Sequence, residues 1–165
     1  MSVSIVVKTR GLAAAVAQLN RLTSWKVEDG ARKISGILES QTLRRIDVEK
    51  RSPDGEAWKP NRTGTSILRR TGRHLRDSIE GRATGADAIV EAHWEHAHVH
   101  QTGMEIRPRN GAALKFWFVD GGHTNFVIAP KVTIPKREFI GLSKDNEAEI
   151  VEELNAMLRS YGSGQ

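Results

Sequence analysis

The chain has 165 residues, of which 38% are apolar, and a mean hydropathy of −0.45, which fits one folded domain spanning residues 1–165. It contains no cysteine, which excludes disulfides and thiolate metal sites. No run approaches the roughly 18 apolar residues of a membrane span, and the N-terminus lacks a signal-peptide pattern. We therefore expect a soluble chain made inside the cell, with no membrane partner.

The formal net charge of +5 is unevenly distributed along the chain. Residues 1–82 contain 17 Lys or Arg against 9 Asp or Glu, a net charge of +8, whereas residues 83–165 contain 8 against 11, a net charge of −3. This division predicts either faces of opposite charge that pair between copies, or one face turned towards a polyanion.

The first 50 residues predict a strand and two helices. Residues 2–9 alternate apolar and polar side chains, which indicates a half-buried strand. Residues 12–22 place leucine and valine at helical spacing, which predicts a short amphipathic helix. Residues 27–50 predict a long helix of about 36 Å, at about 1.5 Å per residue. Its apolar face is formed by Val27, Ala31, Ile34, Leu38 and Ile46.

Polar side chains interrupt that apolar face near the end of the long helix, at Gln41, Thr42 and Arg45. Such a half-polar stripe is typical of a helix that packs on a neighbouring subunit as well as on its own sheet. A solvated outer face explains the same pattern equally well.

Residues 51–66 are predicted to form an extended loop. The sequence Ser-Pro-Asp-Gly at residues 52–55 is a turn signature. Trp58 lies in this otherwise polar segment, where it either closes the edge of the core or anchors a partner. The first outcome is the more common one.

A basic run overlaps the end of this loop and contains Lys59, Arg62, Arg69, Arg70, Arg73 and Arg76. Six positive side chains in one stretch could contact DNA phosphates, with a steep dependence on salt. An arginine rim that pairs with an acidic neighbouring subunit explains the run as well. Thr71 can cap a short helix that ends at Ser78.

The second half predicts strands followed by a helix. A hairpin is expected from residue 79 to 92, around a glycine-containing loop at 83–87. Residues 94–101 are ambiguous between a strand and one helical turn. Residues 114–119 predict a strand with two apolar faces, and residues 126–134 predict an edge strand because Pro130 interrupts them.

A final helix begins after Ser143, with acidic residues in its first turns. Residues 161–165 are predicted to be a flexible tail. The whole order predicts an α+β fold, in which a mostly antiparallel sheet of about four to six strands carries an N-terminal helix pair and a packed C-terminal helix.

Four histidines, His93, His96, His98 and His100, are close in the sequence. On a strand, His96, His98 and His100 would share one face, and on a helix His93, His96 and His100 would cluster. Either arrangement could bind zinc or nickel. The nearby acids match no known ligand spacing, so we favour packing at a sheet edge or at a pH-sensitive subunit contact. We expect no metal and no cofactor.

No pattern in the sequence indicates a catalytic site. GxGxxG, a P-loop, GxSxG and HExxH are all missing, and Ser78 and Ser143 are explained by capping or turns. We therefore do not expect an enzyme. The alternative hypothesis is a DNA-binding protein or a metal-dependent nucleic-acid enzyme that uses the arginine run at 59–76 and the histidines at 93–100.

Four short blocks, in a fixed order, fall within residues 5–160. They read Ser-x-x-Gly-x-x-Trp-x-Pro at 52–60, Leu-x-x-Thr-Gly-x-x-x-x-x-Ser-Ile at 68–79, His-Gln-x-Gly at 100–103 and Pro-x-Arg-x-Phe-x-Gly-Leu-Ser at 135–143. In these blocks the chain resembles the phage virion morphogenesis family, the tail-completion or neck proteins of Mu-like and P2-like contractile-tailed bacteriophages.

The resemblance implies a non-enzymatic virion protein, assembled in the host cytoplasm, that forms a ring at the head–tail junction. Such a ring completes or terminates the tail and joins it to the head, and six copies is the natural number. The implied partners are further copies of the chain, tail tube and sheath proteins, and head-completion or connector proteins. Genomic DNA in the lumen is a possible further contact.

Several side chains are then expected to contact neighbouring subunits or other virion proteins. They are Trp58, Arg69, Arg70, Arg73, Arg76, His100, Gln101, Arg137 and Phe139. The helix at 27–50 and the loop at 51–66 would lie between subunits. The positive half of one copy would meet the negative half of the next, which is a heterologous contact that can close a ring.

Overall fold

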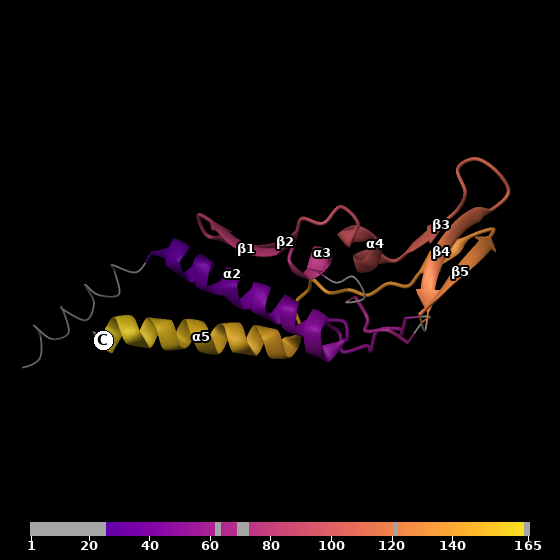
Figure 1. Cartoon of the computed structure of the whole chain (residues 1–165). Helices are drawn as coiled ribbons and strands as arrows, with labels where there is room; N and C mark the ends of the chain where they lie inside the picture. The colour runs from indigo at the N-terminus through magenta and orange to yellow at the C-terminus, as the bar shows by residue number, and fades with distance from the viewer. Residues whose placement is uncertain (1–25, 62–63, 69–72, 121, 164–165) are drawn as a thin grey trace, which may run out of the picture.

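The computed structural model describes residues 26–61, 64–68, 73–120 and 122–163 (Figure 1). Within these ranges helices are combined with antiparallel strands, which confirms the α+β fold class. The strand predicted at 2–9 and the helix predicted at 12–22 lie outside the described residues.

Two long helices run side by side along one end of the molecule (Figure 1). Helix α2 (Val27–Arg44) continues into a π-helical turn, η1 (Arg45–Glu49), so the long predicted helix is confirmed. It stops at Lys50, whose φ of +54° is left-handed and turns the chain out of the helical path. Helix α5 (Lys144–Ser163) packs against α2.

The strands form three separate antiparallel ribbons in the described residues, whereas one sheet of four to six strands was expected. They pair as β1 (Ile79–Thr84) with β2 (Asp87–Ala92), β3 (Met104–Ile106) with β6 (Val132–Ile134), and β4 (Leu114–Asp120) with β5 (His123–Ala129). Helix α4 (Ala97–Thr102) separates the first ribbon from the others along the chain, so no hydrogen-bonded ladder continues between them.

Two differences from the predicted elements follow from this arrangement. The strand expected at 126–134 is divided at Pro130, and its two parts pair with different strands, because proline cannot donate to a ladder. The last helix packs on α2 rather than on a sheet, and it runs to Ser163, past the point where a flexible tail was expected.

The buried core lies between the end of the molecule formed by α2 and α5 and the end formed by the β4–β5 hairpin. It consists of Ile46, Trp58, Leu75, Ile79, Ala97 and Phe139. These residues come from η1, the loop, α3 (Arg73–Arg76), β1, α4 and the segment before α5. The core is therefore assembled from contacts between segments that are distant in the sequence. The β4–β5 hairpin projects away from it at the far end of the molecule (Figure 1).

Candidate assembly surfaces

The side chain of Arg45 joins the long helix to the segment that precedes α5. It is 2% exposed, and its guanidinium donates to the carbonyl oxygens of Phe139 at 2.8 Å and Gly141 at 3.1 Å. It also donates to Oδ1 of Asn146 at 2.7 Å. Burial lowers the pKa of Arg45 from its ordinary value. The sequence placed Arg45 on the apolar face of the long helix, but its burial within one copy could not be predicted, because a charged side chain on a helix is usually solvated.

Gln101 attaches helix α4 to the same segment. Its Nε2 donates to the carbonyl oxygen of Ile140 at 2.7 Å, and its Oε1 accepts the backbone N–H groups of Phe139 and Ile140 at 3.0 and 3.1 Å. The backbone N–H of Arg137 also donates to the carbonyl oxygen of His100 at 2.7 Å. One glutamine thus satisfies three backbone groups that no strand or helix pairs.

Arg137 fixes the loop at 51–66 in the same way. Its Nε and Nη2 donate to the carbonyl oxygen of Lys59 at 3.1 and 3.0 Å, and Nη2 also reaches the carbonyl oxygen of Pro60 at 3.4 Å. Burial lowers the pKa of Arg137. Trp58 lies in this loop and donates from Nε1 to Oγ of Ser52 at 3.1 Å.

Three of the side chains expected to contact partners therefore lie inside this chain. Trp58 is 5% exposed, Arg137 6% and Phe139 1%. Gln101 is half-buried, and its amide group is bonded within the chain. Trp58 closes the edge of the core, which was the more common of its two expected outcomes. We refer to Arg45, Gln101, Arg137, Phe139 and their partners as the central junction.

Two glycines of the sequence blocks allow close packing at this junction. A Cβ on Gly141 would lie 2.5 Å from Cγ of Pro53, so a larger residue would push the loop away. Gly103 has a φ of +74°, and a Cβ there would lie 2.8 Å from the backbone nitrogen of Lys136. The third and fourth sequence blocks are thus explained by packing within one copy.

The basic run is only partly described. Arg69 and Arg70 lie outside the described residues, as does the side chain of Arg73, whose backbone begins α3. Arg76 is exposed, and its guanidinium contacts Asp47 at 2.9 Å and Asp77 at 3.3 Å. The hydrogen bond with Asp47 raises the pKa of Arg76. Its charge is thus balanced within the chain, and phosphate binding would have to compete with these carboxylates.

The histidines lie around a helical turn, which resolves the ambiguity at 94–101. His96 and His100 both pack on Trp94, with ring centroids 5.3 and 5.7 Å from it. His98 is exposed, and its Nδ1 lies 3.0 Å from the carbonyl oxygen of Glu95. Among the residues that the structure describes, no group of three or more His, Asp or Glu side chains could hold a metal ion.

His100 is the titratable histidine nearest the core. Burial, followed by the charges of Arg137 and His96, lowers its pKa. Its Nδ1 is buried and has no hydrogen-bond partner among the described residues. This lowering of the pKa favours the neutral ring, which stacks on Trp94.

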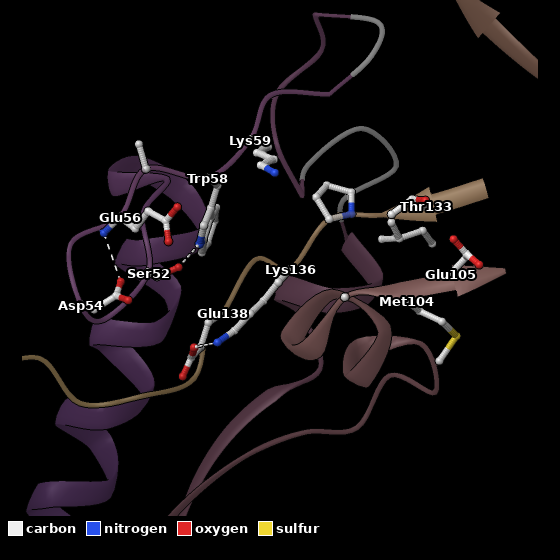
Figure 2. Close-up of a pocket in the computed structure, with 14 residues that line it drawn as sticks. Ser52, Asp54, Glu56, Trp58, Lys59, Met104, Glu105, Thr133, Lys136 and Glu138 are labelled. Carbon is white, nitrogen blue, oxygen red and sulfur yellow. Dashed lines mark hydrogen bonds and ion pairs between the residues drawn. The ribbon is translucent and has the colours of Figure 1, made fainter. Parts of the chain in front are cut away.

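A cleft of about 500 Å³ lies between the loop at 51–66 and the β3–β6 ribbon (Figure 2). Trp58, Met104 and Pro135 line it, together with several charged side chains. Three of its six charged lining side chains, Glu105, Lys136 and Glu138, form ion pairs. Lys136 contacts Glu138 at 2.6 Å, and hydrogen bonds from Lys131 and Arg107 lower the pKa of Glu105.

The β4–β5 hairpin carries an exposed apolar face that the sequence analysis did not single out. Trp117 and Phe126 are opposite each other in the register, with ring centroids 4.5 Å apart. Trp117 is 67% exposed, Phe126 46% and Ile128 60%. Adjoining exposed apolar side chains make this face a candidate interaction site. The alternation at 114–119 predicted the strand, but it could not show which of its two apolar faces would be left open.

A family model for phage virion morphogenesis matches residues 7–159. The match covers nearly the whole chain, including all four sequence blocks. The chain belongs to the phage virion morphogenesis family. No curated protein and no solved structure matches it. As a member of this family it has a part in building the virion of a bacteriophage, which agrees with the resemblance in the four blocks.

The charge of this virion morphogenesis protein is distributed differently from what the two halves of the sequence suggested. Lys33 contacts Glu153 at 3.0 Å, and Arg44 contacts Glu149 at 3.6 Å, so the positive and negative halves already meet inside one copy. Residues 144–163 hold five acids against two bases, whereas residues 107–136 hold five bases against one acid. Helix α5 is therefore acidic, whereas three of the five bases at 107–136, Arg107, Lys131 and Lys136, pair with Glu105 or Glu138.

None of the described helices of this family member is both long and apolar enough to cross a membrane.

Proposed function

We propose that this protein is a structural component of a tailed-phage virion that forms a ring at the head–tail junction. The ring completes or terminates the tail and joins it to the head, and the protein has no enzymatic activity. The family match over residues 7–159 carries this proposal. The finer position, at the neck, rests on the resemblance of the four sequence blocks to tail-completion and neck proteins.

The distribution of apolar side chains supports a role in an assembly. Among the described residues, eight apolar side chains are buried, whereas eleven large apolar side chains are exposed. An isolated two-stranded hairpin is at best marginally stable in water, so the β4–β5 ribbon needs a surface to pack on. A ring of identical copies supplies such a surface without any further protein.

The proposed partners are other copies of the chain, the tail tube and sheath, and the proteins that complete the head. Six copies is the number that fits the resemblance. The basic run at 59–76 faces either a neighbouring subunit or the genome in the lumen. The pairing of Arg76 with Asp47 and Asp77 favours a protein neighbour, since a carboxylate-paired arginine has less charge to offer to phosphates.

A nucleic-acid enzyme built on the arginine run and the histidines finds no support in the described residues. His96 and His100 pack on Trp94, and His98 lies apart from them on the exposed side of α4. A direct assay separates the two functions, because a metal-dependent nuclease cleaves DNA in Mg²⁺, Mn²⁺ or Zn²⁺ and stops on chelation.

Deletion of the gene from a phage that encodes this chain tests the proposed function. We expect lysates with full heads and separate tails, few joined particles, and restoration by the wild-type gene supplied in trans. Cryo-electron microscopy of complemented particles should then locate the protein between tail tube and connector. Infectious particles of normal yield and shape from the deleted phage would overturn the proposal.

A further inference from the structure

The exposed face of the β4–β5 hairpin is organised like the centre of a protein interface. Trp117, Phe126 and Ile128 form its apolar part, and Lys115 stands opposite Ile128 at its border. Covering the aromatic pair would remove roughly 200 Å² from water, given the 150–250 Å² that such side chains bury. Interfaces bury about 800 Å² on each partner. The pair is therefore an anchor within a larger contact.

Among the described residues, helix α5 carries a further exposed apolar surface. Val151 is 57% exposed and Leu158 37%. They are seven residues apart, so they lie on one face of the helix, on the same side as the small Ala148. The face that α5 turns towards α2 is a different one, because Asn146, Glu149 and Glu153 make the contacts there. In the part of the chain that the structure describes, the outer stripe of α5 is thus left exposed.

Charge distinguishes the two surfaces and matches them to each other. Glu147 and Glu152 are exposed and flank the apolar stripe of α5, whereas Lys115 borders the apolar face of the hairpin. Residues 144–163 carry a net charge of −3, from two bases and five acids. Beside the hairpin face the charge comes from Lys115, because Arg107, Lys131 and Lys136 already pair with Glu105 or Glu138. An apolar centre with an oppositely charged rim is the pattern of a specific interface.

The shape of the molecule prevents the two surfaces from meeting within one copy. The hairpin projects at one end, and α5 runs along the other end beside α2 (Figure 1). Since every copy has both surfaces, a contact between them repeats from copy to copy. Such a heterologous contact produces a closed ring when the rotation between copies closes, and a filament when it does not.

We propose that the β4–β5 hairpin of one copy packs across the outer stripe of α5 in the next copy. Trp117 and Phe126 lie on Val151 and Leu158, and Lys115 pairs with Glu147 or Glu152. This inference deepens the proposed function, on which it rests, by naming the subunit contact that builds the ring. It differs from the contact expected from the sequence, because the long helix at 27–50 and the loop at 51–66 are not its centre.

Cross-linking tests this contact directly, because the chain has no cysteine of its own. A variant with both Ile128→Cys and Val151→Cys keeps the aromatic pair and places one thiol on each surface. Treatment with a short bis-maleimide, on purified protein and on isolated tails, should give a ladder of covalent dimers, trimers and larger species. Each single-cysteine variant should give no ladder, since a head-to-tail contact brings unlike positions together.

A matched control uses the turn between β1 and β2. Ala86→Cys combined with Ile128→Cys places the second thiol on an equally exposed site outside the proposed contact. We expect no ladder from this pair. A ladder from the control equal to that from the test pair, or no ladder from the test pair in both preparations, would overturn the contact.

Charge reversal gives an independent test by a gain of assembly. Lys115→Glu should weaken self-association, measured by sedimentation velocity, by at least about tenfold, which is the scale of one lost interfacial charge pair. Adding Glu147→Lys and Glu152→Lys to the same chain should restore the wild-type value. All three sites are exposed, so circular dichroism should be unchanged. Failure of the triple variant to recover while it remains folded would contradict the pairing.

The outcomes separate this inference from the proposed function. A ladder in purified protein, with the polypeptide absent from the head–tail junction of virions, would support the contact and remove the function. A ring located at the junction whose test pair gives no ladder would keep the function and remove the contact.

Discussion

The central junction and the β4–β5 hairpin use large side chains in opposite ways. At the junction, Phe139 is fully enclosed, and buried polar side chains such as Arg45 satisfy backbone carbonyls on distant segments. On the hairpin, Trp117 and Phe126 stack on each other and face outward. The comparison indicates that the junction holds one copy together, and it motivates our proposal that the surface for assembly lies outside it.

The four sequence blocks fall mainly on the first of these regions. Gln101, Arg137, Phe139 and Gly141 belong to the blocks and make contacts within the chain. The exposed hairpin residues lie between the third and fourth blocks. We therefore expect substitutions in the blocks to destabilise the fold, and substitutions on the exposed face of the hairpin to impair assembly. Substitutions in each region test this division.

The largest expected effect is on the core of the junction. Phe139→Ala should lower the free energy of unfolding by about 3–5 kcal/mol, because it leaves a cavity among closely packed side chains. Urea denaturation of the purified protein measures this loss. Phe126→Ala is the matched control, since the same side chain is removed from an exposed site, and it should cost less than about 1 kcal/mol. Equal losses would show that the hairpin is part of the folding core.

A somewhat smaller loss is expected at Arg45. Arg45→Ala removes the donors for the carbonyl oxygens of Phe139 and Gly141, and leaves buried polar groups unpaired, at about 2–4 kcal/mol. Arg44→Ala is the neighbouring control. Its guanidinium is on the surface and pairs with Glu49 and Glu149, so its removal should change stability by less than about 1 kcal/mol. Chemical denaturation of both variants should separate them, and a neutral Arg45→Ala would contradict the junction.

Replacing Gly141 at the junction by alanine should change the stability of the protein in the opposite direction from replacing Gly36 in α2 by alanine. Gly141→Ala places a methyl group against Pro53 and should destabilise the protein by about 1–3 kcal/mol. Gly36→Ala in α2 has open space around its Cβ and should stabilise it by about 0.5–1 kcal/mol. Thermal unfolding of the two variants provides the comparison. A stabilised Gly141→Ala would show that the loop at 51–66 is not closely packed there.

The smallest effect is the dependence of stability on pH that comes from His100. Burial lowers its pKa in the folded state, whereas in the unfolded chain it titrates near about 6.5. The unfolded state therefore binds more protons below that pH, and stability falls as the pH drops through this window. His100→Phe keeps a ring against Trp94 and should reduce the loss of melting temperature between pH 7.5 and 5.5. If the variant loses as much melting temperature between these pH values as the wild type does, other titratable groups cause the pH dependence.

Local periodicity predicted much of the fold. The helix at 27–50, the hairpin at 79–92, the strand at 114–119 and the last helix all correspond to elements of the structure. The arrangement of the strands could not be predicted in the same way. Alternation shows that a strand has two faces, but not which strand it pairs with, and Pro130 divides one predicted strand between two ribbons.

The candidate surfaces could be predicted only in part, for a related reason. Arg45 and Trp117 are misleading as single residues, because arginine is usually solvated and tryptophan is usually covered. Their burial is decided by segments far away in the sequence, which sequence spacing does not reveal. The blocks identified the family correctly, but their residues were expected at subunit contacts, whereas the structure places Arg137 and Phe139 inside one copy.

The most direct test is complementation of a phage lacking this gene by Trp117→Ala, with the yield of joined particles counted by electron microscopy. We predict a variant that unfolds at the same urea concentration as the wild type but leaves heads and tails separate. Joined, infectious particles at the wild-type yield would contradict the assignment of assembly to the hairpin.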